Sequence, residues 1–374
     1  MVEAMTDANS GLAIAHDWLI QPRGAERILN EFCRRQEQLS IYALMCVTDY
    51  VDPAVLRHAV YVSRLNRLPW VGHYYRLLLP FHGWAVEGLQ VGSQPEVLLS
   101  ISHSVAKGIP HAPHVPHICY CLTPMRYVWE REVYGDFMTS APMRAVMSRF
   151  EKRLKAWDLE ANQGVSEFVA ISETVRGRIR RFYGREATVI FPGTNLERFR
   201  PRSRKREDFF LIVSALVPQK RIDLAVESFN HNGLRLWIVG DGPMRTSLRF
   251  RARDNIRFLG ALSDSEILDL YGRASALIFP GLEDFGLVPV EAQACGCPVL
   301  AFRGGGVTET VQEGKSGIFF NSQTADSLND SLRQLRRQSW SEEEVASQVA
   351  DFSVARFVSD WNRYFRERGF QVSL

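Results

Sequence analysis

One stretch decides the fold: Pro280-Gly281-Leu282-Glu283-Asp284-Phe285-Gly286-Leu287-Val288-Pro289-Val290-Glu291. It follows the apolar run Ala276–Phe279, which predicts a buried parallel strand, and it leads into a helix that Gly296 should end. Pro289 suits the first turn of that helix, where a missing N–H costs little. A strand, a glycine turn and a helix start in this order present backbone N–H groups to an anion. The stretch therefore predicts one unit of an α/β sheet with an anion site at the carboxyl end of its strand.

Two carboxylates bracket this turn, Glu283 in the loop and Glu291 about one turn inside the helix. Gly286 would let backbone amides approach a diphosphate, while the two glutamates hold hydroxyl groups on either side of it. The alternative is a helix cap with an unrelated surface acid. The complete strand–loop–helix phrase favours the binding interpretation.

The whole chain has the composition of a soluble globular protein. Its 374 residues fit two domains, and 46% hydrophobic and 23% charged residues are ordinary values. A formal charge of +3 gives no argument for nucleic acid binding. The six cysteines predict reduced, mostly buried thiols in a cytoplasmic protein, since neither Cys-x-Cys pair has the spacing of a zinc site. The first residues lack the pattern of a signal peptide, and no apolar run approaches the ~20 residues of a spanning helix. We expect a soluble or peripheral protein.

The rest of the second half repeats the α/β pattern. Lys220 and Arg221 follow the strand 209–214 and precede a helix from about Ile222, so they could neutralise phosphates at the carboxyl edge of the sheet. Gly240 lies in a strand–turn–helix phrase, a short strand covers 256–260, and Gly304-Gly305-Gly306 forms a second glycine turn. Solvated charge is the alternative for the two cations.

The first half carries its own candidates at strand ends. A strand at 11–15 is followed by His16-Asp17-Trp18 and a helix that starts near Gly24. His103 follows the strand 97–102, and Arg126 lies just beyond the strand 117–122. Arg126 is a candidate anion ligand, with a structural salt bridge as the alternative. Prolines between His111, His114 and His117 argue against a metal site there.

Residues 65–91 interleave aromatics and leucines with arginines. They predict either core-packing helices or an amphipathic surface against a bilayer or a lipid-linked substrate. A crowd of basic residues between Arg144 and Arg185 leaves a similar choice between a solvated face and a surface for anionic lipid.

Strand–helix alternation in both halves predicts two doubly wound domains with a cleft between them. Here the chain resembles glycosyltransferase family 4, with the GT-B fold of two Rossmann-like α/β domains facing a central cleft. The resemblance rests on Glu283 and Glu291 at Glu-x7-Glu spacing, and on the phrases 171–172, 191–195, 217–223, 240–243 and 304–306. His16-Asp17-Trp18 and 121–127 look most like bacterial mannosyltransferases of surface-polysaccharide assembly. The domains would be 1–194 for the acceptor, 195–352 for the nucleotide-sugar, and 353–374 as a helix crossing back to the first.

The resemblance implies a role for each matching residue. Lys220, assisted by Arg221, would pair with the donor phosphates, and the backbone of Phe258 and Leu259 would meet the base. Glu291 would bind the ribose. Glu283 and the amides of Phe285, Gly286 and Leu287 would hold the sugar and diphosphate, with Gly240 in the same donor site. Gly24, Asp17, His103 and Arg126 would line the N-terminal side.

The function implied is transfer of a hexose, with GDP-mannose or alternatively a UDP-sugar as donor, to a lipid-linked saccharide or oligosaccharide. Such enzymes retain anomeric configuration and need no metal or other cofactor, and this one would work in the cytoplasm or peripherally at the inner membrane face. Ala215 and Leu122 stand where many family members have an arginine and a histidine. They motivate an alternative, a catalytically impaired binding or assembly protein.

Overall fold

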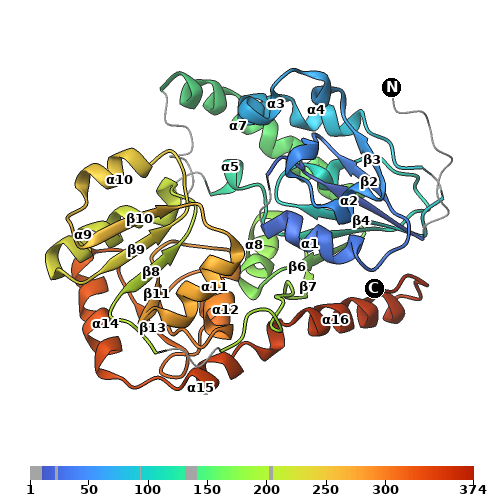
Figure 1. Cartoon of the computed structure of the whole chain (residues 1–374). Helices are drawn as coiled ribbons and strands as arrows, with labels where there is room; N and C mark the ends of the chain where they lie inside the picture. Colours follow the sequence, from blue (N-terminus) through green and yellow to red (C-terminus); the bar gives the residue numbers. More distant parts are fainter. Residues whose placement is uncertain (1–10, 22–23, 93, 131–140, 202–204) are drawn as a thin grey trace. The chain divides into compact units, whose positions relative to one another are not determined.

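The protein is described by a computed structural model covering residues 11–21, 24–92, 94–130, 141–201 and 205–374, with the side chains of 141–148 left aside. The chain divides into two compact units. Unit 1 is Met1–Pro192 with Phe357–Leu374, and unit 2 is Gly193–Arg356. The sequence had placed these divisions after residues 194 and 352. Figure 1 shows the elements of both units.

Unit 1 is built on a seven-stranded sheet of order β3-β2-β1-β4-β5-β6-β7, in which each neighbouring pair is parallel. Its strands are β1 (Leu12–His16), β2 (Ser40–Ala43), β3 (Ala59–Val62), β4 (Val97–Ser102), β5 (His117–Cys121), β6 (Glu167–Ala170) and β7 (Ala187–Val189). Every residue of β1, β4 and β5 is buried. Burial on both faces explains why these strands read as continuous apolar runs.

Two helices of unit 1, α2 (Pro53–Leu56) and α8 (Glu173–Tyr183), begin at side chains that cap them. Other helices of the unit are α1 (Gly24–Cys33), α5 (Arg126–Trp129), α7 (Ala141–Ala161) and most of α16 (Val354–Glu367). The Ser172 side chain accepts a hydrogen bond from the Val175 N–H at the start of α8, and Gly184 ends that helix at φ 63°. On α16, the fully buried Trp361 packs edge-on against Phe32 and Tyr120. The C-terminal helix thus completes the core of unit 1.

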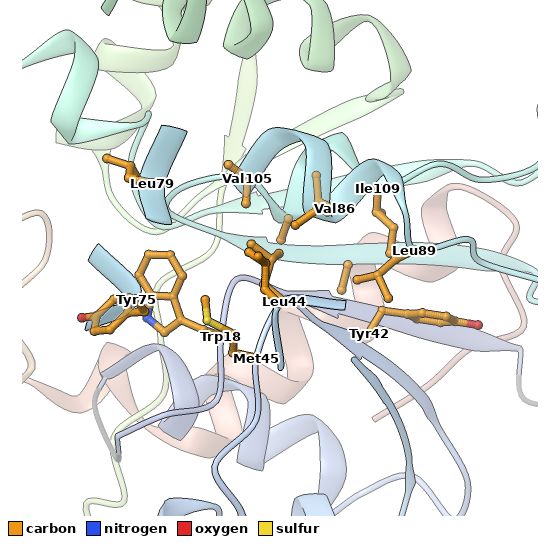
Figure 2. Packing of buried hydrophobic residues seen from close by; sticks show 14 of the residues in the cluster. Trp18, Tyr42, Leu44, Met45, Tyr75, Leu79, Val86, Leu89, Val105 and Ile109 are labelled. Atoms are coloured by element: carbon orange, nitrogen blue, oxygen red, sulfur yellow. The ribbon is translucent and has the colours of Figure 1, made fainter. Parts of the chain in front are cut away.

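Residues 64–87 form four short helical pieces instead of a pair of regular helices. They are η2 (Arg64–Arg67), α3 (Val71–Tyr74), η3 (Tyr75–Phe81) and α4 (His82–Glu87). Pro80 lies inside η3, where its missing N–H and its ring oppose a regular helix. One side of the segment enters the core, where Tyr75 lies 5.2 Å from Trp18 between ring centroids (Figure 2). The other side bears exposed aromatics, and their predicted contact with a bilayer or a lipid-linked substrate stays a prediction.

Unit 2 is built on a six-stranded parallel sheet of order β10-β9-β8-β11-β12-β13. Its strands are β8 (Phe210–Val213), β9 (Leu236–Val239), β10 (Ile256–Gly260), β11 (Ala276–Phe279), β12 (Val299–Phe302) and β13 (Gly317–Phe320). This is the 3-2-1-4-5-6 order of a doubly wound fold, whose direction of winding reverses between β8 and β11. Ligands of such folds bind outside the carboxyl ends of the strands at that point.

The helices of unit 2 are α9 (Ile222–Asn232), α10 (Arg245–Arg251), α11 (Asp264–Arg273), α12 (Leu287–Ala294), α13 (Val307–Thr310), α14 (Ala325–Arg337) and α15 (Glu342–Ser347). A capping box of Ser263 and Glu266 opens α11, and Ser341 caps α15. β13 and α14 were not predicted from the sequence.

Two Rossmann-like α/β domains are therefore confirmed. The cleft expected between them stays a prediction. Within the described ranges, no helix combines the length and apolar character needed to cross a membrane.

Candidate active site

Lys220 and Glu283 meet at the switch point of the unit 2 sheet. β8 and β11 are hydrogen-bonded neighbours, so the loops that follow them start side by side. A Cβ added to Gly281 would lie 2.9 Å from the Lys220 Cα, which shows how closely the two loops approach. The Lys220 ammonium forms an ion pair with the Glu283 carboxylate, and these side chains are only 23% and 19% exposed. The predicted cation and the predicted acid are thus in direct contact.

The turn before α12 has the expected conformation. Gly286 has φ 95°, in the left-handed region that favours glycine, and α12 begins at Leu287. The Phe285 side chain is buried and packs against Phe352 with ring centroids 5.5 Å apart. The buried Phe285 side chain leaves the backbone as the part of this residue that could meet a ligand, and the predicted contact with a diphosphate stays a prediction. Helix N-termini carry partial positive charge, so this turn and Lys220 form one electropositive edge.

The second glycine turn packs directly on this loop. The Gly306 N–H donates to the Glu283 carbonyl oxygen at 2.8 Å. A Cβ on Gly305 would lie 2.2 Å from that oxygen, and one on Gly306 would lie 2.3 Å from the Asp284 carbonyl oxygen. The 304–306 turn therefore supports the Glu283 backbone. The sequence identified both turns but did not predict their contact.

Arg221 points along the same edge. Its backbone has φ 50°, and its guanidinium donates to the Gln323 side chain at 3.2 Å. Gln323 in turn donates to the Pro280 carbonyl oxygen at 2.9 Å. Gln323 thus ties Arg221 to the loop after β11. Sequence reasoning missed Gln323 because the strand before it, β13, was not identified.

Glu291 lies inside α12 and is 5% exposed. The Tyr271 hydroxyl of α11 donates to its carboxylate at 3.4 Å. Glu283 and Glu291 therefore differ in setting: one faces the Lys220 ammonium and the other lies in a mostly buried site. The predicted contact of Glu291 with a ribose requires the ligand to reach this buried carboxylate.

The remaining donor-site candidates lie at the ends of β9 and β10. Gly240 has φ 124°, and its added Cβ would lie 1.9 Å from the Ser214 carbonyl oxygen, so its role is close packing of two loops. Phe258 pairs with Ile238 and Gly260 with Val239, which leaves Leu259 as the extra residue of a bulge. The bulge takes the Leu259 backbone out of the regular ladder, at the place where the sequence predicted contact with a base.

Asp17 organises the candidate residues of unit 1. It is fully buried, and its carboxylate accepts hydrogen bonds from the N–H groups of His103, Val105 and Ala106 at 2.6–2.7 Å. The His103 Nδ1 atom lies 2.7 Å from the same carboxylate, and the His103 side chain is 23% exposed. Burial alone would raise the pKa of Asp17, but the His103 ring and the backbone donors outweigh it and hold the pKa well below its usual range. Asp17 was predicted to line the ligand side; instead it lies beneath His103 and holds that ring in place.

The other two N-terminal candidates lie at helix starts. Gly24 is the first residue of α1, directly after residues outside the described set. Arg126 opens α5 after β5 and is half-buried. The structure brings two of the four candidates of unit 1 together, Asp17 and His103.

The C-terminal part of the chain is similar to a known family of enzymes. Residues 194–350 match the family model described as glycosyl transferases group 1. The chain is 34% identical over 185 residues to D-inositol 3-phosphate glycosyltransferase of Streptomyces bingchenggensis, across 40% of each chain. It is 29% identical over 203 residues to GDP-mannose-dependent alpha-(1-6)-phosphatidylinositol monomannoside mannosyltransferase of Mycobacterium tuberculosis, across 46% of this chain and 53% of that one. The matches thus span about half the length of these curated relatives.

A solved structure shares the fold over nearly the whole chain. Anabaena HepE in complex with UDP matches 95% of this chain and 99% of its own with a TM-score of 0.70, at 15% identity. At that identity the likeness shows the fold, which is GT-B.

Proposed function

We propose that the protein is a retaining glycosyltransferase that moves mannose from GDP-mannose to a lipid-linked saccharide at the inner face of the cell membrane. The observation that carries the proposal is the Lys220–Glu283 pair beside the N-terminus of α12, within the residues that match the group 1 family model. A cation, a helix N-terminus and an acid at a switch point match the needs of a nucleotide-diphospho-sugar.

Donor binding would exchange the partner of Lys220. A diphosphate near the start of α12 would compete for the Lys220 ammonium and leave the Glu283 carboxylate to accept hydrogen bonds from sugar hydroxyls. Negative charge then develops on the departing diphosphate, where Lys220, Arg221 and the α12 amides stabilise it. The acceptor oxygen replaces the diphosphate at the anomeric carbon with configuration retained. These groups supply the stabilisation that a metal ion gives elsewhere, so we propose a reaction without metal or other cofactor.

The other contacts complete the donor site. Glu291 would bind the ribose hydroxyls, and the Phe258–Leu259 backbone would bind the base. His103, held by Asp17, would contact the sugar or the acceptor from unit 1. GDP-mannose is favoured because the mycobacterial relative depends on it, whereas the UDP complex of HepE supports a UDP-sugar as the alternative.

The donor is tested by a thermal-shift panel of GDP-mannose and UDP- and ADP-sugars. A ligand that binds only the folded state raises the melting temperature in proportion to its affinity. A rise in melting temperature with GDP-mannose alone supports the proposal. A rise with a UDP-sugar alone would mean that the donor is that UDP-sugar, and the proposed reaction class would still stand.

The site is tested by Lys220→Ala and Glu283→Gln, with transfer measured by release of the nucleoside diphosphate. Loss of one preorganised cation should lower kcat by about 100- to 1,000-fold. Lys315→Ala, which removes an exposed lysine of the same unit, is the matched control. Full activity in Lys220→Ala would exclude the assigned site, and loss of activity after chelator treatment would exclude the metal-free reaction.

A second candidate is a binding or assembly protein without turnover. Leu122 is buried at the end of β5, and Ala215 lies in the loop after β8, so neither supplies a polar group to a ligand. Donor binding without transfer or hydrolysis, across a series of lipid-linked and oligosaccharide acceptors, would favour this candidate.

A further inference from the structure

Half of the exposed large apolar side chains in the described part of the chain lie within a short segment of unit 1. Five of the ten are found between residues 68 and 84: Leu68, Trp70, Leu77, Phe81 and Trp84. Trp70 is 78% exposed and Trp84 59%. Single exposed apolar residues are normal, but a concentration of large ones marks an interaction surface.

The fold holds this surface in place. Val71, Tyr75, Leu79 and Val86 from the same segment belong to the buried core, and Figure 2 shows three of them among the core side chains. A Cβ on Gly83 would lie 2.8 Å from the Trp157 ring, so α4 packs tightly on α7. Because one side is anchored, the apolar side chains on the other are displayed by a rigid support.

The charge of the segment is of one sign. Residues 64–84 contain Arg64, Arg67 and Arg76 and no aspartate or glutamate. All three arginines are exposed. We call these three residues and the five apolar ones the aromatic–arginine surface.

Helix α7 adds further positive charge next to it. α7 contacts η3, and the Trp157 indole of α7 donates to the Glu87 carboxylate of α4 at 2.6 Å. Arg149, Lys152 and Arg153 are exposed on α7.

Two arginines of α8 form ion pairs within the protein. Arg178 pairs with Glu130 at 2.9 Å, and Arg180 pairs with Glu186 at 2.7 Å. Of the basic residues between Arg144 and Arg185, the exposed ones of α7 therefore lie next to the aromatic–arginine surface.

We propose that the aromatic–arginine surface binds an anionic lipid bilayer. Tryptophan and phenylalanine insert at the headgroup level, and neighbouring arginines pair with lipid phosphates. The absence of any acid from 64–84 fits a uniformly negative partner. The inference rests on the proposed function only because a lipid-linked acceptor would explain why the protein binds a bilayer.

The test is co-sedimentation of the purified protein with vesicles of phosphatidylglycerol and phosphatidylcholine, without donor or acceptor. Binding should need the anionic lipid and weaken as salt is raised from about 0.05 to 0.5 M, where the Debye length becomes short. The triple variant Arg64→Gln/Arg67→Gln/Arg76→Gln should bind on the order of 100-fold less tightly, since each arginine contributes about five-fold near such a surface. The variant Trp70→Ser/Phe81→Ser/Trp84→Ser should lose binding even at low salt.

Two controls separate the surface from general properties of the protein. Arg333→Gln/Arg336→Gln/Arg337→Gln removes the same charge from exposed positions of α14, and Phe250→Ser removes a side chain that is 92% exposed on α10. Both should keep full vesicle binding. Equal binding to neutral vesicles, or equal loss in the controls, would overturn the proposal.

Light scattering of the same variants measures their oligomeric state and tests whether a second copy of the chain binds this surface. If the unchanged protein is a dimer and the Trp70→Ser/Phe81→Ser/Trp84→Ser variant is a monomer, a second copy of the chain covers this surface. That result would overturn the lipid proposal. Because the vesicle test needs no turnover, its failure is distinct from failure of the transferase proposal.

Discussion

At the scale of single residues, Asp17 and His103 act as one group. The carboxylate is saturated by three backbone N–H groups and by the imidazole, all between 2.6 and 2.7 Å. His103 is the partly exposed member, at 23%, and Asp17 fixes its orientation from below. The imidazole is therefore presented in one orientation at the carboxyl end of β4, where a ligand of unit 1 is expected.

We predict that His103→Ala lowers the rate of transfer about 10- to 100-fold with little change in donor affinity, because most of the contacts assigned to the donor lie in unit 2. Asp17→Asn should lower both transfer and stability, since its amide would face the His103 N–H with a donor in place of an acceptor. Steady-state kinetics and the donor thermal shift measure the two effects. His231→Ala, at an exposed position of α9, is the control. A weaker donor shift in His103→Ala would contradict the prediction.

At the scale of elements, the 304–306 turn is a steric support for the Glu283 loop. Gly306 has an ordinary φ of −64°, yet its added Cβ would lie 2.3 Å from the Asp284 carbonyl oxygen. Glycine is required here by space and not by backbone conformation. A substitution at this position therefore tests the contact between the two loops without backbone strain.

Gly306→Ala should destabilise unit 2 by about 1–3 kcal/mol and weaken donor binding, because the Glu283 loop must shift. Gly177→Ala is the matched control, since the Gly177 position in α8 has no atom within 4 Å of the added Cβ. That change should be neutral or stabilising by up to about 1 kcal/mol, because alanine favours helices. Urea unfolding and the donor thermal shift measure both. Unchanged donor binding in Gly306→Ala would show that the loop contact does not shape the site.

The elements also show what the sequence could predict. Strand β11, the Gly286 turn and α12 were predictable because an apolar run, a glycine and a proline at a helix start are local signals. β13 was missed because its run, Gly317–Phe320, begins with glycine, which disfavours strands and leaves only three apolar residues. Missing β13 also hid Gln323, which follows it.

Tertiary contacts could not be predicted from local signals in the sequence. Nothing adjacent in the sequence indicates that Gly306 lies on Asp284, or that Asp17 is covered by the loop after β4. The sequence could name Asp17 and His103 as candidates at strand ends. Which of them is buried and which is exposed depends on how residues 103–106 fold over the end of β1.

At the scale of the whole molecule, the two units differ in their buried histidines. Burial lowers the pKa of His82 to about 4 and that of His117 to about 3, and it also lowers the pKa of His16. All three lie in unit 1, whereas the C-terminal unit has a single histidine, the exposed His231. Each buried ring stays neutral in the folded unit at a pH at which the unfolded chain is already protonated.

This linkage predicts that unit 1 loses stability first as the solution is acidified. Below about pH 6.5 the unfolded chain binds protons that the folded unit does not, so each such histidine reduces the free energy of unfolding by about 1.4 kcal/mol per pH unit. For His82 the loss should continue down to about pH 4, and for His117 to about pH 3. Above pH 7 neither histidine should contribute any slope. Hydrogen exchange between pH 7 and 5, corrected for the intrinsic rate, should therefore show unit 1 opening before unit 2.

His82→Gln isolates one of these contributions. Its ring nitrogen lies 3.1 Å from the Tyr75 carbonyl oxygen, a contact that a glutamine N–H can also make. The variant should flatten the dependence of unfolding free energy on pH between 6 and 4.5 by about 1.4 kcal/mol per pH unit, whatever its effect at neutral pH. His73→Gln, which removes a solvent-exposed histidine from the same segment, is the control. Equal slopes for the two variants in urea unfolding would mean that the buried His82 ring takes up its proton without unfolding, and that acid lability of unit 1 has another origin.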